Sequence, residues 1–104
     1  MAQTKLDAKI NIDASQTASV MVAAVAQKSI RVVQVAMVTG GTATNVTFNS
    51  STTAISPLFA NAANGGAILP YNYEGWFSTV PGEALTITTG SGSTTGILVG
   101  YLLI

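Results

Sequence analysis

Apolar and polar residues alternate with a period of two along several short segments of the chain, which is the pattern of a half-buried β-strand. Three segments show it clearly: KLDAKINID (5–13), NVTFN (45–49) and ALTITT (84–89). The apolar positions that we expect to face the core are Leu6, Ala8, Ile10, Ile12, Val46, Phe48, Leu85 and Ile87. The polar residues between them, Asn49 and Thr86 included, are predicted to face solvent. The alternation therefore predicts one-sided strands of a sandwich or a barrel.

Three other segments are apolar on both faces: ASVMVAAVA (18–26), IRVVQVAMV (30–38) and ILVGYLLI (97–104). In the second segment, the alternation of side chains along a strand predicts two apolar faces. One face carries Ile30, Val32, Ala36 and Val38, and the other carries Val33, Val35 and Met37. The Ala-rich first segment could be a helix, whereas β-branched residues favour strands in the other two. A two-sheet sandwich buries one face of each sheet, so a second apolar face needs another cover. We expect another copy of the chain to supply it, in a homo-oligomer.

Glycine-rich and proline-containing stretches predict where the chain turns. TGGTAT (39–44) and GSGSTTG (90–96) lie between apolar runs and fit hairpin loops. NGG (64–66) is a turn signal because Asn and Gly tolerate positive φ, and VPGE (80–83) fits a type II turn centred on Pro81 and Gly82. About eight short strands result, with no long helical pattern. We predict one all-β domain over 1–104, a two-sheet antiparallel β-sandwich, with residues 1–4 as a flexible N-terminal arm.

The chain carries very little charge, which limits the classes of partner that it is expected to bind. Four basic and four acidic residues make up 8% of its 104 residues and give a net charge of zero. Binding along a nucleic-acid backbone needs clustered cations, and a membrane-surface helix needs a basic face, so neither partner is expected. The longest apolar run, 97–104, is too short to cross a bilayer as a helix. The polar start has no secretory signal, so we expect a soluble protein made in the cytoplasm.

The residues of common catalytic and metal sites are scarce. The chain has no Cys and no His, the usual thiolate ligand and general base. Glu74 and Glu83 could form a glycosidase pair, and Ser29 beside Lys28 could be a nucleophile, but neither spacing matches a known catalytic arrangement. We therefore predict a protein that is not an enzyme and has no cofactor and no metal site. Glu83 is expected to accept hydrogen bonds from turn amides or to cap a neighbouring loop.

Aromatic residues cluster in one place. Four of the seven lie between Tyr71 and Phe77, in the stretch LPYNYEGWFSTVPGEAL (69–85). Exposed rings on one face would form a platform for a sugar or another ligand. Rings in the core or at a subunit contact would act as packing anchors, and aromatic anchors are enriched in interfaces. We favour the second interpretation, with a largely buried Trp76. The candidate core or subunit-interface anchors are Tyr71, Tyr73, Trp76, Phe77 and Tyr101.

The segment from Val46 to Ile87 resembles small structural proteins of tailed bacteriophages. The resemblance lies in an apolar strand with Thr-Phe, an Ala-Ile-Ser step, AANGG, and then PYN, GWF and GEAL. It covers less than half of the chain, and the first 40 residues match only in hydrophobic rhythm. No catalytic or binding motif is part of it, so no functional residue is carried over.

This resemblance implies a jelly-roll-like sandwich that assembles as a homotrimer on a virus particle. The expected function is that of a capsid decoration or cement protein, which binds the major capsid protein on the outer surface of a phage head and stabilises it. Its location would be the capsid surface of the virion. The alternative is a receptor- or glycan-binding knob of a phage tail or head fibre. Fold analogy alone does not decide between them.

Overall fold

The computed structural model describes the backbone of residues 5–104 and the side chains of residues 10–104. The predicted N-terminal arm, residues 1–4, lies outside the described residues. Ten strands and no helix occur within the described part, which confirms the all-β prediction. The strands are β1 (Lys5–Ile12), β2 (Ser19–Val22), β3 (Ile30–Thr39), β4 (Thr44–Ser50), β5 (Thr53–Ala54), β6 (Phe59–Asn61), β7 (Gly66–Leu69), β8 (Phe77–Ser78), β9 (Leu85–Thr89) and β10 (Thr95–Leu103).

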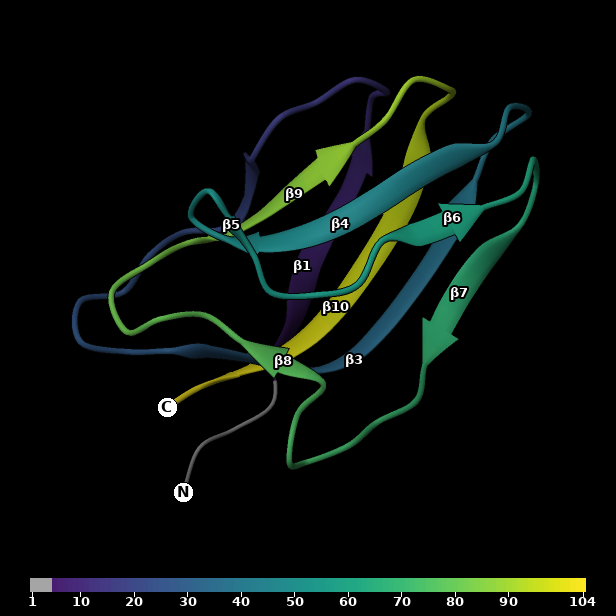
Figure 1. Ribbon diagram of the computed structural model, residues 1–104. Helices are drawn as coiled ribbons and strands as arrows, with labels where there is room; N and C mark the ends of the chain where they lie inside the picture. The colour runs from purple at the N-terminus through teal and green to yellow at the C-terminus, as the bar shows by residue number, and fades with distance from the viewer. Residues whose placement is uncertain (1–4) are drawn as a thin grey trace.

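The strands form two antiparallel sheets packed as a sandwich (Figure 1). Sheet A has the order β1-β10-β3-β7, and β8 also pairs with β3. Sheet B has the order β2-β9-β4-β5, and β6 also pairs with β4. The short strands β5 and β6 both pair with β4, so together they correspond to one interrupted strand. The same holds for β7 and β8, which both pair with β3. Counted in this way, the chain has about eight strands, as predicted, and their order is compatible with a jelly roll.

Two of the expected hairpin loops connect the sheets instead. The loop after β3 leads to β4, and the loop after β9 leads to β10, so each joins one sheet to the other. The hairpin interpretation was wrong because a short polar loop between apolar strands does not reveal which sheet receives the second strand. The other two turn predictions are confirmed. Asn64 has a φ of 58°, and the type II turn has a φ of 85° at Gly82 and a 3.0 Å hydrogen bond from the Glu83 amide to the Val80 carbonyl.

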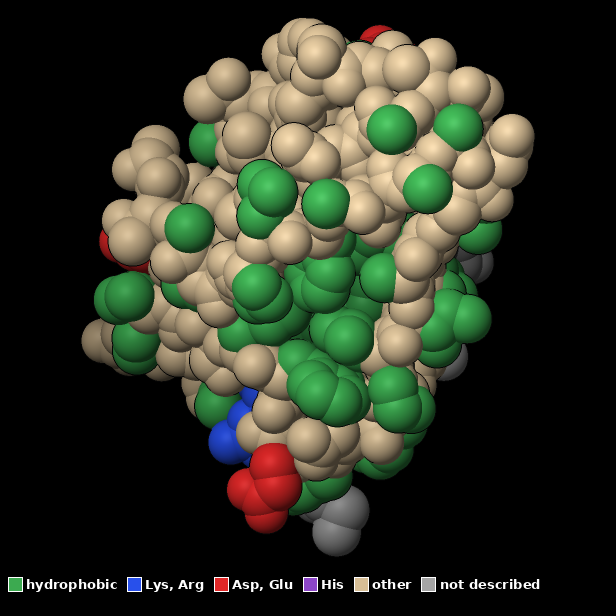
Figure 2. Space-filling view, turned by 45° about the vertical axis from the view of Figure 1, so that its right-hand side comes forward, with side chains coloured by type: hydrophobic (Ala, Val, Ile, Leu, Met, Phe, Trp, Pro, Cys, Tyr) green, Lys and Arg blue, Asp and Glu red, His purple; other side chains and the backbone are tan. Residues whose placement is uncertain are grey.

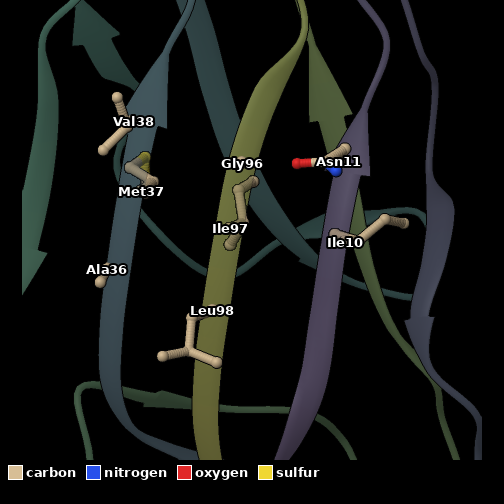
Figure 3. A pocket seen from close by; sticks show the side chains of 8 residues that line it. All are labelled: Ile10, Asn11, Ala36, Met37, Val38, Gly96, Ile97 and Leu98. Carbon is tan, nitrogen blue, oxygen red and sulfur yellow. The ribbon is translucent and has the colours of Figure 1, made fainter.

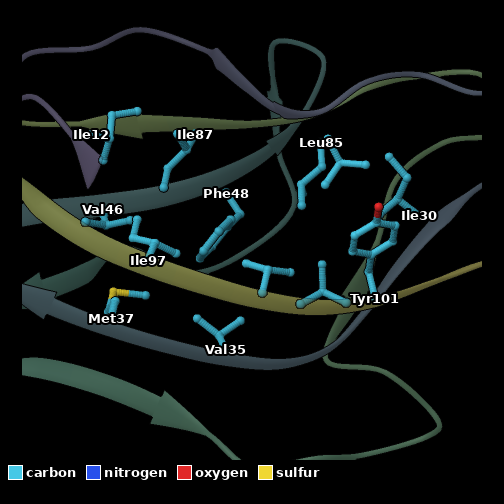
Figure 4. Packing of buried hydrophobic residues seen from close by; sticks show 13 residues of the cluster. Ile12, Ile30, Val35, Met37, Val46, Phe48, Leu85, Ile87, Ile97 and Tyr101 are labelled. Atoms are coloured by element: carbon cyan, nitrogen blue, oxygen red, sulfur yellow. The ribbon is translucent and has the colours of Figure 1, made fainter. Parts of the chain in front are cut away.

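The core lies between the sheets and is centred on Phe48, which is fully buried. Its ring meets Phe59 edge-on at 6.2 Å and Phe77 at 5.2 Å between ring centroids. Figure 4 shows Phe48 pointing from β4 into the cluster, with Val35 and Met37 of β3 pointing back toward it. The predicted inward residues with described side chains are all in the cluster or packed against it: Ile10, Ile12, Val46, Phe48, Leu85 and Ile87.

A β-bulge in β3 changes which residues face the core. Val32 pairs with Tyr101 but Gln34 pairs with Gly100, so Val33 is an extra residue on β3. The extra residue reverses the alternation. The core side of β3 therefore carries Ile30, Val32, Val35 and Met37, whereas Ala36 and Val38 lie on the outer side. The predicted division of this strand into two faces was wrong for that reason.

Two further predictions need correction. In the segment 18–26, only Ser19–Val22 is a strand, and the four residues after it are an exposed loop rather than a helix or a two-faced strand. Asn49 and Thr86 are 5% and 4% exposed rather than solvent-facing. Their polar atoms are satisfied, since Asn49 Nδ2 donates to Thr88 Oγ1 at 2.9 Å and Thr86 Oγ1 donates to the Ser51 carbonyl. Hydrogen bonding is what permits this burial.

Candidate interaction surface

The face of sheet A that points away from the core carries exposed aliphatic side chains. Val38 on β3, Ile68 on β7 and Leu98 on β10 are 64%, 76% and 36% exposed. They lie next to one another because Ala36 pairs with both Leu98 and Ile68, on neighbouring strands. Isolated surface aliphatics are ordinary, whereas a large contiguous apolar patch on one face is a candidate interaction surface. We call this group of residues, with Ala36 and Gly96 between them, the outer face of sheet A.

The outer face is hollowed along β10. A groove of about 400 Å³ runs between β1 and β3, over Gly96 (Figure 3). A second groove, of about 220 Å³, adjoins it on the β7 side and reaches Pro70 and Tyr71. Both grooves are lined by Ala36 and Leu98. The hollow exists because Gly96 has no side chain, and a Cβ there would meet only Asn11 Oδ1, at 3.2 Å.

The aromatic loop, residues 70–76, follows β7 and is tied to β3 by backbone hydrogen bonds. The amides of Asn72 and Trp76 donate to the carbonyls of Val33 and Val32, each at 2.8 Å. The Gly75 amide closes a turn onto the Asn72 carbonyl at 2.8 Å. Trp76 Nε1 donates to the Pro70 carbonyl at 2.8 Å, so the ring spans the loop from one end to the other. These bonds hold the loop in one conformation.

Arg31 supports the same loop from β3. Its Nη1 donates to the Tyr73 carbonyl at 3.2 Å, and its guanidinium carbon lies 5.8 Å from the centre of the Tyr73 ring, within cation–π range. Its aliphatic stem passes so close to Gly75 that a Cβ there would be 2.5 Å from Arg31 Cγ. Gly75 also has a φ of 88°, which favours glycine. The tight turn and the arginine therefore depend on each other.

The predicted aromatic anchors divide into two groups. Tyr101 is 8% exposed and belongs to the core, and Phe77 packs against the core, as predicted. Tyr71, Tyr73 and Trp76 are 52%, 54% and 42% exposed, so a core role is wrong for them. In this segment Phe77, on the two-residue strand β8, packs against the core, whereas the three rings before it belong to the loop at the surface. As subunit-contact anchors, these three residues stay a prediction.

Figure 2 shows how the surface looks from the side that carries β7. Hydrophobic side chains gather near the middle of this view, and few charged side chains are visible on it. The exposed residues Leu58, Ile68, Tyr71 and Trp76 belong to the segment between β5 and β8, which includes this side of the sandwich. The surface is suited to close packing rather than to ion pairing.

Glu83 and Glu74 both lie in loops. Glu83 Oε1 accepts a 2.5 Å hydrogen bond from Ser50 Oγ, which in turn accepts the Val80 amide at 2.9 Å, so Glu83 is linked to this turn amide through the Ser50 hydroxyl at the end of β4. Glu74 is exposed in the aromatic loop, where its amide donates to Asn72 Oδ1 at 3.1 Å. Within the described residues, no cluster of three acidic, His or Cys side chains could hold a metal ion. That part of the chain also contains no helix of the length and hydropathy needed to cross a membrane.

The sequence analysis did not predict the main part of this surface, which is the outer face of sheet A with its hollow at Gly96. The apolar character of both faces of 30–38 and 97–104 predicted a cover for a second apolar face, but the bulge at Val33 altered which residues of 30–38 lie on each face. The hollow at Gly96 depends on pairing between distant strands and leaves no local signal. No known protein family, curated protein or solved structure matches this chain.

Proposed function

We propose that this protein is a structural component of a virus particle, a decoration or cement protein that binds the outside of a phage head and stabilises it without doing chemistry. The observation that carries the proposal is the exposed apolar surface of a sandwich with only 8% charged residues, which comprises the three rings of the aromatic loop and the aliphatic outer face of sheet A. A surface of this kind binds by packing and hydrogen bonds. The sequence resemblance between Val46 and Ile87 points to the same class of protein.

The aromatic loop supplies the contact anchors in this proposal. Trp, Tyr and Arg are the residues that most often dominate binding energy in interfaces. Trp76 and Tyr73 belong to this loop, and Arg31 of β3 is bound to Tyr73. A loop that is already ordered loses little conformational entropy on binding. We propose that these side chains contact the major capsid protein on the capsid surface. Because ion pairs have little part in such a contact, attachment should depend weakly on salt.

Stabilisation follows from mass action. A protein that binds the assembled shell, but not its disrupted form, favours the assembled state at every site it occupies. The proposal includes a homo-oligomer, for which the resemblance implies a trimer. An oligomer bridges several capsid subunits and thereby adds the effect of linked binding sites.

The copy number in purified particles tests this function. The chain is quantified against the major capsid protein by mass spectrometry with isotope-labelled standards. A decoration protein is expected at a fixed fraction of the capsid subunits, in the ratio set by the symmetry of the head. Absence from heads, or a few copies confined to tails, would contradict the proposal.

A receptor- or glycan-binding knob is the second candidate, and a specific observation favours it. Tyr71, Tyr73 and Trp76 expose about half of their surface on an ordered loop that also carries Asn72 and Glu74. Exposed rings with polar neighbours suit a sugar. Titration of the Trp76 fluorescence with polysaccharide purified from the host surface distinguishes the candidates. A saturable change that Tyr73→Ala abolishes would support the knob, and an unchanged spectrum would support the decoration protein.

A further inference from the structure

Large and small residues alternate in a regular pattern on the outer face of sheet A. The two central strands, β3 and β10, pair so that three successive outward positions each join one large and one small residue across the two strands. The three neighbouring pairs are Val38 with Gly96, Ala36 with Leu98, and Gln34 with Gly100. The small member changes strand at each step: Gly96 is on β10, Ala36 on β3, and Gly100 on β10.

We propose that sheet A of one copy packs face to face on sheet A of a second copy, around a two-fold axis that runs between β3 and β10, parallel to the strands. Such a rotation exchanges β3 and β10, so that β10 of one copy lies over β3 of the other. Positions at the same level along the strands then face each other. Gly96 faces Val38 of the partner subunit, and Leu98 faces Ala36 of the partner subunit. Every small residue on the central strands thus receives a large one.

The packing geometry required is that of a domain interior. Aligned sheets pack about 10 Å apart with their strands at about 30°, and their facing layers fit best when large and small residues interdigitate. The groove of about 400 Å³ over Gly96 is the space that the second copy's valine enters. A two-fold interface needs a surface that is complementary to itself, and this alternation provides one.

The flat area of the face falls just below the range for stable interfaces, before surface relief and the rim are counted. Four strands about 4.8 Å apart are about 19 Å wide, and the nine residues of β10 extend over about 30 Å. The flat area is therefore roughly 570 Å² before surface relief is counted, against about 800 Å² per partner in a standard interface. Tyr71 lies at the rim of the adjoining groove and extends the apolar area beyond the sheet.

The charge of the face also favours a second copy. Among outward residues with described side chains at its centre, Asn11, Gln34, Ala36, Val38 and Leu98 carry no charge. Arg31 lies farther along β3 and is engaged with Tyr73. On the two central strands, two copies can therefore meet without burying an unpaired charge, which is costly in an interface. Lys9 pairs with Leu98 on the edge strand β1, so the charge that the contact must accommodate lies at its rim. The outer Asn and Gln can hydrogen-bond across the contact.

This inference rests on the homo-oligomer of the proposed function and specifies its contact. It leaves the aromatic loop available for the capsid. A two-fold contact predicts a dimer where the resemblance implies a trimer, so the mass of the assembly separates the two. Dimers that fail to bind phage heads would overturn the proposed function and leave this inference standing, whereas head-bound trimers would overturn this inference and leave the proposed function standing.

The experiment measures the mass and the dissociation constant of the full chain by sedimentation equilibrium at micromolar concentrations. We expect a species of twice the chain mass of 10.6 kDa. Gly96→Val adds apolar surface but fills the hollow, so it should weaken dimerisation by about tenfold or more. Val38→Ala combined with Gly96→Val moves the large residue to the other strand and should restore dimerisation to within about threefold. Val20→Ala is the matched control, because Val20 is 58% exposed on sheet B, and it should change nothing.

Each outcome has a defined meaning. A monomer or a trimer for the unaltered chain would overturn the two-fold contact. Tighter association of Gly96→Val would also overturn it, because that result would indicate unspecific hydrophobic association. Circular dichroism melts check the fold of every variant. If Gly96→Val does not fold, Val38→Lys is compared with Val20→Lys: loss of the dimer only in Val38→Lys supports the contact, and equal behaviour of the two contradicts it.

Discussion

Replacement of Trp76 by Ala tests whether Trp76 is a partly exposed loop residue or a core residue. Trp76 is 42% exposed, so somewhat more than half of its surface is removed from water. A fully enclosed Trp buries about 150–250 Å², which puts the buried part of this one at roughly 90–145 Å². At about 25 cal/mol per Å², reduced for residual compactness of the unfolded chain, burial contributes about 2 kcal/mol. The hydrogen bond from Nε1 to the Pro70 carbonyl adds about 1 kcal/mol.

We therefore expect Trp76→Ala to lower the free energy of unfolding by about 2–3 kcal/mol. Phe48→Ala is the comparison, because Phe48 is fully buried between two rings and its loss should cost about 3–5 kcal/mol. Trp76→Phe keeps most of the ring and should lose about 1 kcal/mol. Urea denaturation followed by circular dichroism, at one fixed protein concentration, gives all three values. A loss below about 1 kcal/mol for Trp76→Ala would refute the reasoning, because the ring would not be held by the loop.

Two other variants test how the loops are fixed. Gly75→Ala should destabilise the protein by about 1–3 kcal/mol, because the residue has a φ of 88° and the new methyl would lie 2.5 Å from Arg31 Cγ; urea denaturation measures it, and an unchanged midpoint would contradict the proposed strain. Ser50→Ala should cost about 1–3 kcal/mol, because the hydroxyl joins the Val80 amide to Glu83; a melt of this variant equal to that of the unaltered chain would show that water replaces it.

The fold class could be predicted from the sequence because a strand with one buried face shows a local alternation of apolar and polar residues. Val46 and Phe48 alternate with polar residues, and both are fully buried. The turn at Pro81 and Gly82 could be predicted for the same reason, since its backbone angles depend on the residues in the turn itself. Whether a loop returns to the same sheet depends on packing between distant segments, so the connections after β3 and β9 were not predictable from local composition.

The candidate site was only partly predictable. The apolar character of both faces of 30–38 and 97–104 predicted that a second face of these strands needs a cover. The extra residue at Val33 is defined by the pairing of β3 with β10, and it determines that Ala36 and Val38 face outward. Trp76 was expected to be largely buried, in the core or at a subunit contact, because aromatic anchors are enriched in interfaces. The short β8 and the hydrogen bond to the Pro70 carbonyl hold it at the surface instead.

The central claim, that this protein stabilises a phage head from the outside, is tested most directly by heating heads with and without it. Heads from which the protein has been stripped or deleted are warmed in a DNA-binding dye, and the temperature of DNA release is recorded. We expect depleted heads to release DNA at a lower temperature than complete ones, and added purified protein to restore the original value. Depleted heads that are equally heat-resistant but no longer adsorb to host cells would contradict the claim and favour a receptor-binding knob.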